Sequence, residues 1–241
     1  MNMTTTANNT AILMENIQSY IYQEKILLQM SDTNYIPALR YNWLTKFYDR
    51  LLDVTFPERK IKQALIDECA FRDNENVLDF GVGTATLSIM IKQQFPSISI
   101  TGIDVDSKIL EIAKNKVNDN VQLVQYDGSH IPLPDDSIDK IVSSLVFHHI
   151  PTLNKKIVLK ELYRVLKSSG ELHIADFGKA ANLYTKAAFG IFRRFDGEEN
   201  TRVNAMGLLP QFIKEAGFDN VEITKSFNTA FGTVNLIKAV I

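Results

Sequence analysis

A carboxylate and two closely spaced glycines stand together at the end of an apolar run. Residues 77–83 read VLDFGVG, and a stretch with helical spacing begins at Thr84. Gly81 and Gly83 allow a tight turn and a close ligand approach, because glycine has no Cβ. The first turn of a helix also offers backbone N–H groups without intrahelical partners. The segment with Asp79 therefore predicts a ligand site, although an isolated Gly-x-Gly turn can also be a plain tight turn.

Two further carboxylates end the next two predicted strands. Asp104 follows the second strand, about twenty residues after the glycine turn, where a carboxylate can accept both ribose hydroxyls of a nucleoside. Asp127 follows the third strand and can accept a hydrogen bond from an exocyclic amine such as that of adenine. As alternatives, Asp104 is a helix N-cap and Asp127 a turn residue. Three carboxylates at this edge fit the place where open α/β sheets bind ligands.

Candidate catalytic groups lie at the ends of the fourth and fifth predicted strands. His148 and His149 follow the fourth strand, and Asp176 ends the fifth. A histidine can exchange a proton near neutral pH, so either could be a general base. Alternatively, one histidine packs or bonds backbone while the other is solvated, and Asp176 caps a helix. No metal site is predicted, because adjacent imidazoles rarely point at one ion.

Strands and helices alternate through the middle of the chain, which predicts a parallel sheet with helices on both faces. The predicted strands are 77–80, 98–103, 121–125, 138–145 and 171–175. The predicted helices are 57–70, 84–94, 107–117, 153–167 and 205–216. Strands 221–227 and 231–240 are joined too closely for a parallel crossover, so they predict an antiparallel hairpin. The fold class is α/β, a mostly parallel seven-stranded sheet with a C-terminal antiparallel hairpin.

The regions outside this sheet are expected to shape the acceptor site. Residues 1–56 are predicted to form a disordered tip and a helical cap, with helices over 11–30 and 41–55, and residues 57–241 the ligand-binding domain. Residues 183–200 contain three phenylalanines and the pair Arg193-Arg194. The aromatic residues suggest an apolar or aromatic acceptor, and the arginines could hold a carboxylate or phosphate. The alternative is a helix with an apolar core face and a basic solvated face.

Composition excludes several classes of function. The 241 residues are 45% apolar and carry a formal net charge of −2, so no nucleic acid partner is expected. Cys69 is the only cysteine, which excludes an intrachain disulfide framework. No apolar run is long enough to span a membrane, and no secretory signal starts the chain, so a cytoplasmic location is expected. Oligomeric state is not indicated.

As a set, these motifs resemble one family. Residues 79–85 (DFGVGTA) resemble the first motif of the class I S-adenosylmethionine-dependent methyltransferases, especially the branch with ubiquinone and menaquinone biosynthesis enzymes. The other similar segments are 102–106 (ribose-binding strand end), 127–139 (adenine loop), 143–150 (segment under the sulfonium) and 166–172 (turn before the fifth strand). The resemblance runs from about Tyr41 to the C-terminus, and it implies a Rossmann-like fold.

The resemblance also implies roles for individual residues. The glycine turn and its carboxylate would hold the methionine moiety of S-adenosylmethionine, the second strand end the ribose and the third the adenine. The implied cofactor-binding residues are Asp79, Gly81, Gly83, Asp104, Val105, Asp127, Gly128, Ser129 and Ser144. The family's first motif usually has a third glycine where this chain has Ala85. Alanine is a small change inside a helix start, so we expect cofactor binding to survive.

The predicted function is methyl transfer by in-line displacement from S-adenosylmethionine to a small-molecule acceptor. A dinucleotide cofactor fits less well, because its fingerprint requires a small residue where Thr86 stands. The same scaffold could instead methylate a macromolecule such as tRNA or a protein, or bind the cofactor without catalysing a reaction.

Overall fold

The computed structural model describes residues 56–117, 120–181 and 203–241. All of them lie in one compact unit, Asp49–Ile241. The helices predicted over 11–30 and 41–55 lie outside the described residues, as does the segment 183–200. The predicted domain boundary at residue 56 therefore stays a prediction. Among the described residues, no helix has the length and apolar character needed to cross a membrane.

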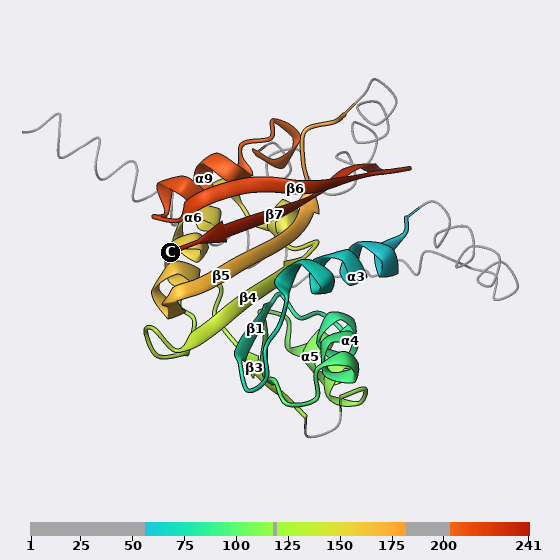
Figure 1. Ribbon diagram of the computed structural model, residues 1–241, viewed down its shortest axis with the longest axis vertical. Helices are drawn as coiled ribbons and strands as arrows, with labels where there is room; N and C mark the ends of the chain where they lie inside the picture. The colour runs from blue at the N-terminus through green and yellow to red at the C-terminus, as the bar shows by residue number, and fades with distance from the viewer. Residues whose placement is uncertain (1–55, 118–119, 182–202) are drawn as a thin grey trace, which may run out of the picture. The chain divides into compact units, whose positions relative to one another are not determined.

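The described residues form a seven-stranded sheet with the order β3-β2-β1-β4-β5-β7-β6 (Figure 1). The strands are β1 Asn76–Phe80, β2 Ser99–Asp104, β3 Val121–Gln125, β4 Ile138–Ser144, β5 Leu166–Phe177, β6 Asp219–Thr229 and β7 Gly232–Val240. β1 to β5 pair in parallel, whereas β7 lies antiparallel between β5 and β6. This topology confirms the predicted sheet and its C-terminal hairpin.

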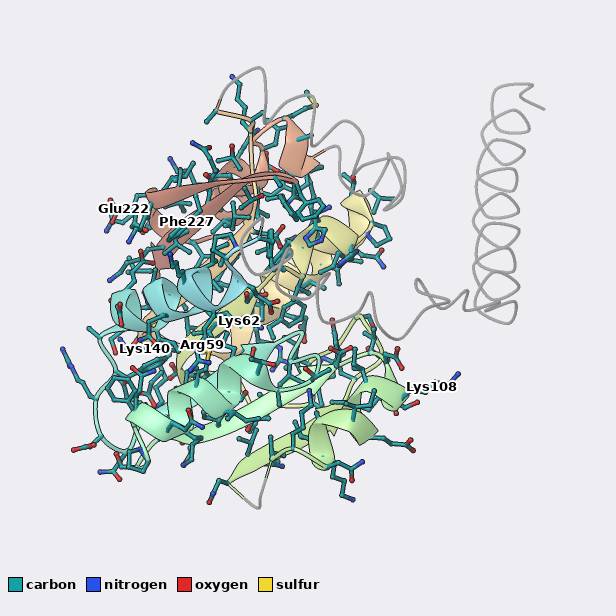
Figure 2. All side chains as sticks on the ribbon, turned by 90° about the vertical axis from the view of Figure 1, so that its right-hand side faces the viewer. Arg59, Lys62, Lys108, Lys140, Glu222 and Phe227 are labelled. Carbon is teal, nitrogen blue, oxygen red and sulfur yellow. The ribbon has the colours of Figure 1, made fainter. Side chains whose placement is uncertain are left out.

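Helices cover both faces of the sheet. The described helices are α3 Glu58–Cys69, α4 Thr86–Gln94, α5 Ser107–Lys114, α6 Thr152–Val165, α9 Leu209–Glu215 and the 3-10 helix η1 Phe147–His149. β1 alternates between the two faces: Val77 packs with α3 and α4, whereas Leu78 and Phe80 pack with α6 and α9. Figure 2 shows the side chains from another side, with Lys62 on α3 and Glu222 and Phe227 on β6. Burial on both faces explains why the central strands are almost continuously apolar.

Several element boundaries differ from the predicted ones, and three of the differences are larger than two residues. β5 begins at Leu166 rather than at 171, because Leu166 pairs with Ile138 across a register shift. α5 ends at Lys114 rather than at 117. α9 begins at Leu209 rather than at 205, because Gly207 adopts a φ of +72° that breaks the helix. The carboxyl ends of β1 to β5 lie within two residues of their predicted positions.

The carboxyl ends of the parallel strands share one edge of the sheet. Phe80 at the end of β1 lies opposite Ile103, and Asp104 at the end of β2 lies opposite Gln125. Ser144 at the end of β4 lies opposite Ala175 in β5. The sheet therefore brings the predicted cofactor and catalytic segments to the same edge, as expected for an open α/β fold.

Candidate active site

The turn after β1 needs glycine at position 81. The backbone N–H groups of Gly81 and Val82 both donate to the Ile103 carbonyl at 2.9 Å, which ties the turn to β2. Gly81 has a φ of +71°, and a Cβ built there would lie 2.4 Å from a methyl carbon of Val146. The turn after β1 therefore touches the segment after β4, so the two motifs meet in space.

The second glycine faces space that no described residue fills. Gly83 has a φ of +53°, and among the described residues a Cβ built there would meet only the Gly81 carbonyl oxygen, 4.0 Å away. Its N–H donates to Asp104 Oδ2 at 3.0 Å. A side chain at position 83 would thus enter a space that a ligand can fill.

Ala85 lies elsewhere than predicted. It is not inside the helix start but is the N-cap of α4, fully buried, with a φ of +61° in the left-handed region. Non-glycine residues adopt that region at a cost of about 1–2 kcal/mol. Alanine in place of the family's third glycine therefore adds backbone strain at position 85. The fold accommodates this strain and buries the Ala85 methyl group.

The carboxylate at the end of β2 braces the glycine turn. Asp104 Oδ1 accepts the Asp106 N–H at 3.1 Å, and its Oδ2 accepts the Gly83 N–H. Asp106, not Asp104, is the N-cap of α5, because it accepts the N–H groups of Lys108 and Ile109. Asp104 is only half-buried, and each carboxylate oxygen has a second lone pair for a ligand.

The carboxylate at the end of β3 lies in a turn of its own. Asp127 Oδ1 accepts the N–H and hydroxyl of Ser129, both at 2.8 Å, and the His130 N–H at 2.9 Å. These bonds lower the pKa of the exposed Asp127 to about 2, so it is charged at neutral pH. A Cβ on Gly128 would lie 3.6 Å from Val105, whose side chain is exposed. This corner thus offers a carboxylate beside an apolar surface.

Asp79 is held on the α4 side of β1. It is almost fully buried and accepts the Ser88 hydroxyl at 2.6 Å. Burial is the main reason why the pKa of Asp79 rises to about 6, while the Ser88 bond opposes the rise. Asp79 thus lies directly before the glycine turn, and its contact with a ligand stays a prediction.

Asp176 is the centre of a buried polar cluster at the end of β5. Among the described residues, five donors reach its two fully buried oxygens. They are the backbone N–H groups of Val146 at 2.9 Å, Phe147 at 2.7 Å and Phe177 at 2.7 Å, with His148 Nδ1 at 2.9 Å and Asn204 Nδ2 at 3.1 Å. Asp176 accepts the N–H groups at the start of η1, so it makes helix-capping contacts, and its contact with a methyl acceptor stays a prediction.

The two histidines occupy different environments. His148 is buried, with 2% of its surface exposed, and its Nδ1 bonds Asp176 Oδ1. A carboxylate can only accept, so Nδ1 carries the proton and Nε2 the lone pair in neutral imidazole. His149 is exposed, and its ring centroid lies 3.9 Å from that of His148. His148 is therefore the histidine whose orientation Asp176 fixes.

Lys155 and Asn204 also belong to the Asp176 cluster, and sequence reasoning missed both. Lys155 is fully buried in the first turn of α6 and donates to the Ile150 carbonyl at 2.7 Å. Burial lowers the pKa of Lys155 to about 8, while the Asp176 charge opposes that shift. A lysine in a helical pattern gave no signal of burial, and Asn204 belongs to no recognisable motif.

Ser144, at the end of β4, has a buried hydroxyl group without a hydrogen-bond partner among the described residues. An unpaired buried hydroxyl costs about 1–3 kcal/mol. A bound ligand or water that bonds Ser144 would remove this cost. The orphaned hydroxyl lies at the edge where the cofactor was predicted.

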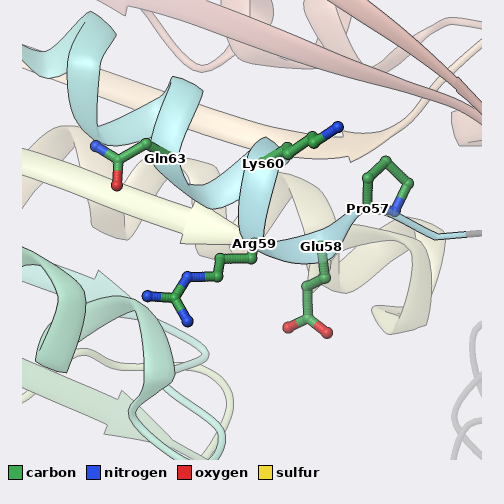
Figure 3. A pocket seen from close by; sticks show the side chains of 5 residues that line it. All are labelled: Pro57, Glu58, Arg59, Lys60 and Gln63. Carbon is green, nitrogen blue, oxygen red and sulfur yellow. The ribbon is translucent and has the colours of Figure 1, made fainter. Parts of the chain in front are cut away.

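A surface pocket of about 410 Å³ lies on the first turns of α3 (Figure 3). Its described lining residues are Pro57, Glu58, Arg59, Lys60 and Gln63. None of the predicted site residues is among them. This pocket is therefore separate from the set of predicted site residues.

Known proteins resemble this chain in sequence and fold. A family model described as a methyltransferase domain matches residues 77–170. The demethylmenaquinone methyltransferase of Listeria innocua is 30% identical over 169 residues, covering 61% of this chain and 70% of the relative. That of Lactobacillus johnsonii is 25% identical over 240 residues, covering 88% and 97%. A solved S-adenosylmethionine-dependent methyltransferase from Aquifex aeolicus has a TM-score of 0.58 at 20% identity, covering 80% of this chain and 98% of that one.

The chain belongs to the class I S-adenosylmethionine-dependent methyltransferases, in the ubiquinone and menaquinone biosynthesis branch. It is a small-molecule methyltransferase that uses S-adenosylmethionine, and a dinucleotide cofactor, a macromolecular acceptor and a non-catalytic role are all disfavoured. The residues present fit this cofactor. Gly83 leaves open space, Ser144 offers an unpaired hydroxyl, and Asp127 stays charged beside an apolar surface.

Replacing Gly83 by alanine is expected to separate cofactor affinity from stability. The new Cβ enters open space, so the cost in the free energy of unfolding is about 1–2 kcal/mol, from the left-handed φ alone. The same Cβ occupies cofactor space, so affinity for S-adenosylhomocysteine falls at least tenfold. Calorimetric titration and urea unfolding measure the two effects. Unchanged affinity in a folded G83A variant would show that no ligand passes Gly83.

Replacing Lys155 by methionine is expected to flatten the pH dependence of stability. Between pH 8, the lowered pKa, and 10.5, its ordinary value, the unfolded chain binds more protons at Lys155 than the folded protein. The contribution of Lys155 to the free energy of unfolding therefore rises as the pH increases from 8 to 10.5, and it is lost as the pH falls from 10.5 through 8. Urea unfolding at several pH values measures this slope. K160M, at an exposed position, should keep the wild-type slope, and a K155M slope equal to it would contradict the prediction.

Proposed function

We propose that this enzyme methylates a quinone-type ring of the demethylmenaquinone class. Two relatives named demethylmenaquinone methyltransferase match this chain over most of their own length. The structural observation that supports the proposal is the buried His148–Asp176 pair next to the glycine turn. Val146 connects the two, because its side chain approaches Gly81 and its N–H bonds Asp176.

The cofactor residues divide into three groups in this proposal. Gly81 and Gly83, with Asp79 before them, border the methionine moiety. Asp104 accepts the ribose hydroxyls. Each of its oxygens has one lone pair that is not used by the hydrogen bonds from the Gly83 and Asp106 N–H groups. The end of β3 and the loop after it hold adenine.

The adenine corner combines charge with an apolar surface. Asp127 accepts the exocyclic amine, and the exposed Val105 near Gly128 packs on the ring. Ser129 already donates its N–H to Asp127, so it shapes this carboxylate rather than offering a free amide. Ser144 bonds the cofactor through its otherwise unpaired hydroxyl.

His148 acts as the general base. Bound S-adenosylmethionine supplies a methyl group made electrophilic by its sulfonium. In its reduced form the ring carries hydroxyl groups, and it becomes a better nucleophile when His148 Nε2 accepts one hydroxyl proton. Methyl transfer would then form a bond between a ring carbon and the methyl carbon and break the methyl–sulfur bond. The hydrogen on that ring carbon would leave as a proton, which restores the aromatic ring. Asp176 fixes the imidazole through Nδ1 and stabilises the imidazolium that forms. The buried surroundings of His148 exclude water, which strengthens this interaction.

The acceptor can be tested directly. Enzyme, methyl-labelled S-adenosylmethionine and demethylmenaquinone, in oxidised and chemically reduced forms, are incubated and extracted into organic solvent. We expect label in the quinone fraction and a product in which one methyl has replaced one hydrogen. Phosphoethanolamine and bulk tRNA serve as competing acceptors. Label in either of these, with none in the quinone, would refute the proposed acceptor.

A further inference from the structure

Asn204 lies in a short helical segment before α9 and is fully buried. Its side-chain Nδ2 donates to Asp176 Oδ1 at 3.1 Å and to the Phe177 carbonyl at 3.0 Å. Both partners can only accept. A flipped amide would place its oxygen against two oxygens, so the chemistry of the site fixes the orientation.

This orientation leaves the other end of the amide without a partner. Asn204 Oδ1 is buried and accepts no hydrogen bond from the described residues. A buried carbonyl oxygen without a donor is unfavourable, whereas an apolar side chain of the same size would avoid that cost. The anchor on Asp176 thus holds an acceptor oxygen that a ligand donor can use.

The donor end of the Asn204 amide is anchored close to the proposed base. Asn204 Nδ2 and His148 Nδ1 bond the same oxygen of Asp176, so these two nitrogens are at most about 6 Å apart. Asp176 therefore positions a general base and a hydrogen-bond acceptor together at the carboxyl end of β5. The same carboxylate thus holds the proposed base and the Asn204 amide.

We propose that Asn204 Oδ1 accepts a hydrogen bond from a hydroxyl group of the methyl acceptor and thereby selects hydroxylated rings. This inference rests on the proposed ring acceptor but adds a residue that determines specificity. A ring without a hydrogen-bond donor leaves Asn204 Oδ1 unpaired. Such a ring should therefore bind more weakly than a hydroxylated one. The role concerns binding, because proton removal belongs to His148.

The test uses two rings of nearly the same shape, 1-naphthol and 1-fluoronaphthalene. Only the first donates a hydrogen bond. Their affinities are measured by calorimetry with the full-length enzyme saturated with S-adenosylhomocysteine. We expect the wild type to prefer 1-naphthol at least tenfold. N204L should lose that preference, with S-adenosylhomocysteine affinity within twofold of the wild type.

Two more variants keep the test independent of folding. N204T keeps a hydroxyl that can donate to Asp176 but lacks the amide oxygen, so it should lose the preference as N204L does. I213V, at a fully buried position in α9, should keep it. A purely structural role for Asn204 would weaken both rings equally.

The outcomes separate the two proposals. Equal wild-type affinity for the two rings, or a preference that N204L and N204T retain, would overturn the role of Asn204 and leave the ring acceptor standing. Failure of the wild type to bind either ring would overturn the ring acceptor, and the role of Asn204 with it.

Discussion

Replacing Asp176 by alanine is expected to lower the free energy of unfolding by about 3–5 kcal/mol. The carboxylate is fully buried and receives five hydrogen bonds from described residues, and the substitution removes the acceptor of all five bonds. The Asp176 carboxylate holds both the segment after β4 and Asn204, so its removal should also abolish methyl transfer. Urea unfolding followed by circular dichroism measures the stability.

Two comparison variants sharpen this prediction. D176N keeps the shape but only one accepting oxygen, so an intermediate loss of about 2 kcal/mol is expected. D219A, at the exposed start of β6, should stay within about 0.5 kcal/mol of the wild type. A D176A protein that loses less than 1 kcal/mol would show that the cluster does not hold the segment after β4.

Replacing His148 by glutamine is expected to lower kcat by a factor of about 10²–10⁴, the usual contribution of a general base. Glutamine can still donate to Asp176 Oδ1, so the fold and the cofactor affinity should survive. Steady-state kinetics with saturating S-adenosylmethionine, together with calorimetric titration of S-adenosylhomocysteine, separates the two effects.

His149 provides the matched control. It is the neighbouring imidazole but is exposed, so H149Q should lower kcat by less than tenfold. If H149Q loses more activity than H148Q, the exposed histidine is the base, and the contact between His148 and Asp176 is structural. If neither variant loses activity, the acceptor needs no base from this pair.

The sheet and the positions of the carboxylates were predictable because their signals are local. Apolar runs lead up to Asp79 near the end of β1, Asp104 at the end of β2 and Asp127 just after β3. Parallel pairing brings those strand ends to one edge. The short link before β7 likewise forced the antiparallel hairpin. These features depend on spacing of a few residues, which a single sequence shows directly.

The Asp176 cluster was not predictable, because it is assembled from distant segments. Asn204 and Asp176 come from elements far apart in the chain, and no motif marks their contact. Sequence spacing did bring His148 and Asp176 to neighbouring strand ends, but it could not choose between His148 and His149. The left-handed backbone at Ala85 also escaped prediction, because alanine rarely adopts it.

Calorimetric titration of the wild type and D104A measures whether the glycine turn and the carboxylates at the ends of β1, β2 and β3 bind S-adenosylmethionine. The wild type should bind S-adenosylmethionine and S-adenosylhomocysteine with micromolar affinity, about −8 kcal/mol, and should not bind NAD. D104A should bind both adenosyl compounds more weakly by about 1–3 kcal/mol, through lost hydrogen bonds to ribose. Binding of NAD in place of the adenosyl compounds, or a D104A affinity equal to that of the wild type, would contradict this assignment of the site.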